Sequence, residues 1–115
     1  MATVEFPISI PSHAISFSCS IMRLPRALFV WAGNEPKMGY LSVSVPSRDP
    51  SQPPVGSIIL QNSSRATQLS SRLTALLGLQ VFISGDLADE SDFIWTALED
   101  RITEEINTNP TLFQK

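Results

Sequence analysis

The chain has 115 residues, of which 43% are hydrophobic and 17% charged, with a net charge of −3 and an isoelectric point near 4.9. This length and balance are typical of one globular domain, which we expect to span residues 1–115. The eight basic residues are spread along an acidic chain, which argues against nucleic-acid binding because neutralising phosphates needs clustered Lys and Arg.

Cysteine usage and the first residues predict the cellular environment. Cys19 is the only cysteine, so the chain cannot form an internal disulfide, and a reducing compartment is expected. The start, M-A-T-V-E-F-P, lacks the basic and apolar regions of a signal peptide. Apolar runs stay well short of the ~20 residues needed to span a bilayer. We therefore expect a cytoplasmic protein.

The first third of the chain has the pattern of β-strands. Residues 4–10 alternate loosely, and Pro7 favours an edge strand because proline has no N–H to donate. Residues 15–24 alternate strictly, which is typical of a half-buried strand. The next strand, 28–32, is apolar at every position, which predicts cover on both of its faces. Pro25-Arg26 is the predicted hairpin turn between these two strands.

Two further strand signals flank a proline-rich segment. Residues 40–45 alternate, and residues 58–60 form a short apolar run. Between them, residues 46–54 hold four of the nine prolines and are predicted to form a loop.

The remaining sequence predicts helix, strand, helix. The first helix follows the N-cap residues Asn62 and Ser63 and ends before Gly78, a typical C′ residue. Residues 80–84 predict another strand covered on both faces, and residues 92–107 a second helix. Apolar stripes comprise Ala66, Leu69, Leu73, Leu76 and Leu77 in the first helix, and Phe93, Ile94, Ala97, Leu98, Ile102 and Ile106 in the second. We predict an α+β fold with a mostly antiparallel sheet of about six strands.

The sequence offers few groups for catalysis. His13, the sole histidine, lies in a Pro-Ser turn, where we expect an ordinary surface side chain. Cys19 alternates with apolar residues, and burial raises the pKa of a thiol and makes it inert. A small hydrolase that uses Cys19 and His13 is an alternative supported only by the presence of one residue of each type.

An acidic group precedes the second helix, at Asp86, Asp89, Glu90 and Asp92. The spacing differs from that of calcium loops, and Gly85 precedes all four residues instead of lying among them. Carboxylates at this place favour a helix N-terminus through its dipole. We therefore predict no metal, no cofactor and no enzymatic activity.

Two helices can cover only one face of the sheet, so something else must cover the other. The less aliphatic sides of the strands combine aromatic and small polar residues, a composition typical of protein interfaces. We expect Phe29, Trp31, Tyr40 and Phe82 to contact a partner there. The helices would then cover Leu28, Val30, Leu41, Val43, Val81 and Ile83. The alternative is that the proline-rich loop of the same chain covers Phe29 and Trp31.

Several short motifs occur in one order along residues 15–113. They are M-R-L at 22–24, L-F-V-W-A-G at 28–33, L-S-S-R-L at 69–73, Q-V-F-I-S at 80–84, S-D-F at 91–93, E-D-R-I at 99–102 and E-E-I at 104–106. In this order and spacing, the chain resembles the proteasome assembly chaperone 4 family.

The resemblance implies a non-enzymatic chaperone. Members of the family pair with proteasome assembly chaperone 3, a protein of similar fold. The heterodimer binds α-type subunits during assembly of the α-ring of the 20S core particle and leaves before the particle is complete. Family members have helices on one face of a sheet and dimerise through the other. We expect a location in the cytoplasm and also in the nucleus.

Three further residues are weaker candidates for contacts at the rim of the interface or with α-type subunits: Met22, Arg23 and Arg48. The alternative function is a homodimeric α+β adaptor or trafficking scaffold, in which the same open face pairs with a second copy.

Overall fold

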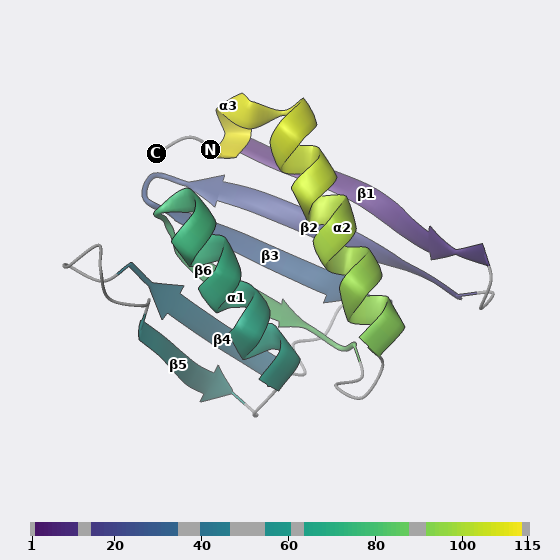
Figure 1. The fold of residues 1–115 in the computed structure, drawn as a ribbon, viewed down its shortest axis with the longest axis horizontal. Coiled ribbons are helices and arrows are strands. Elements are labelled where there is room, and N and C mark those ends of the chain that lie inside the picture. Colours follow the sequence, from purple (N-terminus) through teal and green to yellow (C-terminus); the bar gives the residue numbers. More distant parts are fainter. Residues whose placement is uncertain are drawn as a thin grey trace.

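The computed structural model describes residues 2–11, 15–34, 40–46, 55–60, 64–87 and 92–113. In chain order the elements are β1 Ala2–Ile10, β2 Ile15–Leu24, β3 Ala27–Gly33, β4 Tyr40–Val45, β5 Val55–Leu60, α1 Ser64–Leu77, β6 Gln80–Gly85, α2 Asp92–Thr108 and α3 Pro110–Phe113 (Figure 1). Apart from Pro46, the predicted proline-rich loop lies outside the described residues.

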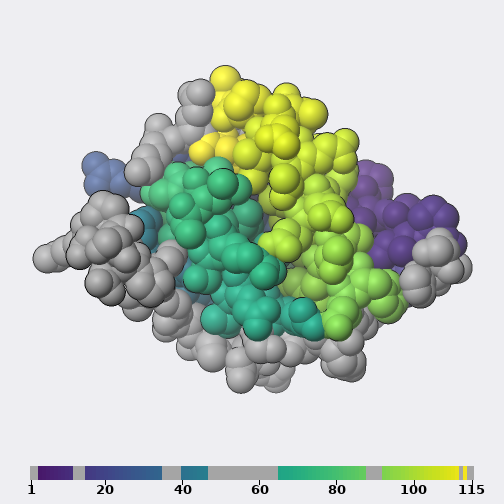
Figure 2. Space-filling view, in the orientation of Figure 1, coloured from purple at the N-terminus to yellow at the C-terminus, as the bar shows by residue number. Residues whose placement is uncertain are grey.

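The strands form one sheet in the order β1-β2-β3-β6-β4-β5. All neighbours are antiparallel except β3 and β6, which are parallel. Both α1 and α2 lie over the same face, and their side chains hide much of the sheet from that side (Figures 1 and 2). The predicted α+β class, with a mostly antiparallel sheet and two helices on one face, is confirmed. Pro7 lies in the edge strand β1, as expected.

The core lies between the helices and the sheet. It is built from alternate residues of each strand, because successive side chains point to opposite faces. Ile21, Leu28, Val30, Val81 and Ile83 are completely buried and come from the three central strands. Burying each of these side chains stabilises the fold by roughly 1.5–3 kcal/mol. From the helices, the core is completed by Leu69, Leu73, Trp95, Leu98 and Ile102.

Helix α1 contacts β4 through hydroxyl groups. The Ser44 and Ser70 hydroxyl oxygens are 2.9 Å apart, and both residues are fully buried. The Thr74 hydroxyl donates to the Ser44 carbonyl at 3.2 Å, and the Ser42 and Thr67 hydroxyls lie 3.2 Å apart. Small side chains let the helix approach the strand closely, and the paired hydroxyls offset the cost of their burial.

The helix ends agree with the sequence in part. Gly78 has a positive φ of 69°, and its N–H donates to the Thr74 carbonyl at 2.8 Å, as expected of a C′ glycine. The short helix α3 was not predicted, because Asn109-Pro110 marked only an end. Phe113 within it is buried in the core.

Two side chains of the predicted apolar stripes, Leu76 and Phe93, are exposed. Leu76 was expected to be buried but is 65% exposed on α1, because Leu73, Thr74 and Leu77 occupy the inward side of that turn. On α2, Phe93 is exposed while Trp95 is buried, with its ring centroid 5.9 Å from that of Tyr40. Trp95 lies three residues before Leu98 and seven before Ile102, so it shares the buried side of α2 with them.

The structure predicts an unreactive thiol at Cys19. Burial raises the pKa of Cys19 to about 12, so almost no thiolate forms at neutral pH. We expect a disulfide reagent at pH 8 to leave the native protein unlabelled and to label one thiol per chain in denaturant. Fast, stoichiometric labelling of the native protein would contradict the buried position.

A second prediction concerns the hydrogen bond between the Ser44 and Ser70 hydroxyls. Because Ser70 donates to the Thr67 carbonyl at 3.0 Å, the Ser44 hydroxyl must donate to Ser70. Ser70→Ala removes that acceptor and should lower the free energy of unfolding by about 1–3 kcal/mol. Denaturant unfolding measures the effect, with Ser71→Ala as a neighbouring, partly exposed control. Equal stability of the two variants would show that the contact contributes nothing.

Candidate partner-binding face

The face of the sheet away from α1 and α2 is called the open face below. Two contacts identify the helix-facing side chains: the Arg101 guanidinium lies 4.4 Å from the Phe6 ring centroid, and Tyr40 packs against Trp95. Phe6 is paired with Cys19 across β1 and β2, so Cys19 shares the helix-facing side. Residues one step along each strand therefore point to the open face.

A row of large apolar residues crosses four strands of the open face. Met22 of β2 is paired with Phe29 of β3, which is paired with Phe82 of β6, which is paired with Val43 of β4. The Phe29 and Phe82 rings are stacked, with centroids 6.0 Å apart and planes 24° apart. Met22, Phe29 and Phe82 each remain partly exposed. We call these four residues the cross-strand row.

A second row lies one step further along the strands. It places Ser20, Trp31, Ser84 and Leu41 side by side in register. Ser84 is fully buried and donates its hydroxyl to the Tyr40 carbonyl at 2.8 Å, which ties β6 to β4. Trp31 stays partly exposed beside the cross-strand row.

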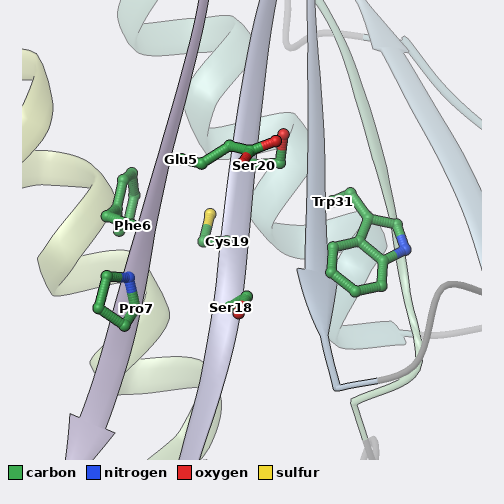
Figure 3. Close-up of a pocket in the computed structure, with 7 residues that line it drawn as sticks. All are labelled: Glu5, Phe6, Pro7, Ser18, Cys19, Ser20 and Trp31. Atoms are coloured by element: carbon green, nitrogen blue, oxygen red, sulfur yellow. The ribbon is translucent and has the colours of Figure 1, made fainter.

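Next to Trp31, the open face has a shallow hollow of about 420 Å³ over β1 and β2. Figure 3 shows Glu5 reaching across β2 toward Ser20, with the Trp31 indole on the other side. Its lining on this face consists of Glu5, Pro7, Ser18, Ser20 and Trp31. An aromatic ring beside hydroxyl and carboxylate groups is suited to an interface rim, since such rims are polar.

The structure brings three of the four predicted partner contacts together. Phe29, Trp31 and Phe82 share the open face, and Met22 lies beside them. Their role in binding stays a prediction. The placement of Tyr40 on this face is wrong, because Tyr40 is 6% exposed and packs against Trp95 of α2.

Of the two candidate arginines, the structure describes Arg23 and not Arg48. Arg23 lies at the β2–β3 turn, where its guanidinium donates to the Leu24 carbonyl and, at 3.1 Å, to the Ala27 carbonyl. It therefore holds the turn, and the proposed rim contact is untested. Arg48 lies outside the described residues.

The side chains of strand β4 point to the faces opposite to those predicted. Leu41 and Val43, expected under the helices, lie on the open face, as does the 42% exposed Val45. Ser42 and Ser44 take the helix side because α1 presents hydroxyls there. A signal for this was present: Thr67, Ser70 and Thr74 are spaced three and four apart and form a polar stripe on α1.

Those groups considered for catalysis or metal binding that lie within the described residues do not form a site. Cys19 is buried on the helix-facing side, and His13, Asp89 and Glu90 lie outside the described residues. Asp86 accepts a hydrogen bond from the Asn34 backbone N–H at 3.1 Å, and Asp92 begins α2. Within the described ranges, His, Cys, Asp and Glu nowhere gather in threes able to hold a metal ion. The described helices include none long and apolar enough to cross a membrane.

Comparison with known proteins gives consistent matches. The family model described as Proteasome assembly chaperone 4 matches residues 16–87. Proteins named Proteasome assembly chaperone 4 from Mus musculus and Homo sapiens are each 34% identical over 94 residues, covering 81% of this chain and 76% of theirs.

A solved structure agrees in fold. A chain from the crystal structure of a chaperone complex for yeast 20S proteasome assembly superposes with a TM-score of 0.65, covering 90% of this chain and 98% of that one. The two sequences are only 11% identical, so this likeness concerns the fold alone. With the family model and the two mammalian relatives, the conclusion is clear: this chain belongs to the proteasome assembly chaperone 4 family.

Proposed function

We propose that this chain is a non-catalytic chaperone of 20S proteasome assembly, and that it pairs through its open face with proteasome assembly chaperone 3. The cross-strand row is the observation that supports this pairing most directly. Its aromatic residues are aligned by strand register and stay partly exposed on the face away from both helices. Contiguous exposed apolar surface of this kind marks interaction sites.

The shape and the aromatic content of the cross-strand row favour a protein partner over a small ligand. The Phe29 and Phe82 rings stack against each other on neighbouring strands, so they form a continuous apolar surface on the open face. Aromatic side chains contribute most of the binding energy when a partner removes their water. Trp31 extends the surface toward the polar hollow over β1 and β2.

The heterodimer would act on proteasome α-type subunits during α-ring assembly, in the cytoplasm and nucleus. A partner on the open face leaves the outer surfaces of α1 and α2 accessible (Figure 2). Burial raises the pKa of the Cys19 thiol and keeps it protonated, which argues against Cys19 as a nucleophile.

A substitution on the open face tests the pairing. Trp31→Asp places a charge within the interface and should weaken binding of purified assembly chaperone 3 by about 2 kcal/mol or more, roughly 30-fold. Titration calorimetry measures the affinity. Leu76→Asp is the matched control, since it introduces the same charge at a residue 65% exposed on α1. If both variants keep full affinity and circular dichroism shows them folded, Trp31 does not contribute to pairing.

Purification of the tagged protein from its own cells tests the function as a whole. We expect one small partner at equal stoichiometry together with proteasome α-type subunits, but without the full set of mature β-subunits. Mass spectrometry of the eluate identifies them. A preparation that contains only this chain, sedimenting as a stable homodimer, would contradict the proposal and favour the homodimeric adaptor or trafficking scaffold.

A further inference from the structure

A second hollow lies at one end of the sheet, and we call it the end hollow. It has a volume of about 470 Å³ and lies where the β2–β3 turn, the end of β4 and the loop between α1 and β6 meet. Figure 1 shows these three segments at the same end of the molecule. The residues that line it include Pro25, Arg26, Val45, Pro46, Leu79 and Gln80.

The end hollow is mostly apolar, and two of its lining residues are prolines. Leu79 is 4% exposed and Val45 42% exposed, so the hollow combines a buried apolar residue with an accessible one. Pro25 and Pro46 are both exposed, and their rings fix the backbone φ angle. Proline rings have little side-chain freedom to lose, so contacts with them lower the entropy cost of binding.

The described residues that line the end hollow together carry a positive charge, whereas the whole chain is negative. Among the described residues that line it, Arg26 is the one charged side chain, and it is exposed at the turn. Arg23 adds a second positive charge to this turn, where it donates to the Leu24 and Ala27 carbonyls. In a chain of net charge −3, this local positive charge favours a ligand that carries a carboxylate.

The end hollow is continuous with the open face. Val45 lies two residues beyond Val43 of the cross-strand row, and Gln80 two residues before Phe82. Side chains two residues apart in a strand share a face, so both residues point to the open side. A partner seated on the cross-strand row would therefore have its edge at this hollow.

We propose that the end hollow binds an extended segment of the partner chaperone, in which an apolar side chain stands next to a carboxylate. The apolar side chain enters between Pro25, Val45 and Pro46, and the carboxylate pairs with Arg26. This inference rests on the proposed function, because it assigns the segment to the protein that covers the open face.

Charge reversal at the turn tests the carboxylate. Arg26→Glu should weaken binding of purified assembly chaperone 3 about 5- to 10-fold at low salt, and the difference should shrink at high salt because screening removes a rim charge interaction. Arg72→Glu on α1 is the control with the same change in net charge, and it should bind as the unmodified chain does. Equal affinities for both variants would overturn the proposed carboxylate contact.

Crosslinking tests the segment itself. Cys19 is buried, so a benzophenone maleimide can be attached selectively to Pro46→Cys, with Leu76→Cys as the exposed control. We expect light to crosslink the partner only from position 46, and mass spectrometry to find an apolar residue beside Asp, Glu or a C-terminal carboxylate. A crosslink to a segment without a carboxylate, or none at all, would overturn the inference.

The experiments distinguish failure of the proposed pairing through the open face from failure of the proposed contact at the end hollow. If Trp31→Asp abolishes pairing while Arg26→Glu leaves it intact, the open face binds the partner and the end hollow does not. If the unmodified chain shows no affinity for assembly chaperone 3, both proposals are wrong.

Discussion

The structure depends on one constraint: two helices can bury only one face of a sheet whose central strands are apolar on both. Leu28, Val30, Val81 and Ile83 are buried under the helices, while Phe29 and Phe82 of the same strands stack on the other side. The parallel pairing of β3 with β6 aligns the two phenylalanines. The strands that supply the centre of the core therefore also present, with their alternate residues, the surface that we assign to a partner.

Most of the fold could be predicted because its strands and helices carry clear periodicity. The fully apolar strand β3 indicated cover on both faces, and Gly78 indicated the end of α1. The orientation of β4 could not be predicted from hydrophobicity alone. Its serines are buried because hydroxyls on α1 pair with them, an interaction between segments 26 residues apart in sequence at Ser44 and Ser70.

The sequence predicted most of the residues of the candidate site, but not all of them. Phe29, Trp31 and Phe82 lie on strands with a clear register, so the sequence placed them together correctly. Tyr40 was misplaced because the faces of its strand are exchanged relative to the prediction. Trp95 was overlooked, although it lies three residues before Leu98 and seven before Ile102 and so belongs to the buried stripe of α2. The end hollow joins a turn, a strand end and a loop, and no local pattern brings such segments together.

The edge of the sheet limits how this protein can associate. Pro7 lies within the edge strand β1, and proline there lacks the N–H that an added strand would need. Sheet extension by a strand of another chain is therefore disfavoured along β1, which also guards against aggregation. If the proposed partner binds the open face with a sheet of its own, the two sheets would lie about 10 Å apart with interdigitated side chains. Contacts of this kind are made by side chains rather than by backbone groups. The sequence of a partner would therefore determine whether it binds.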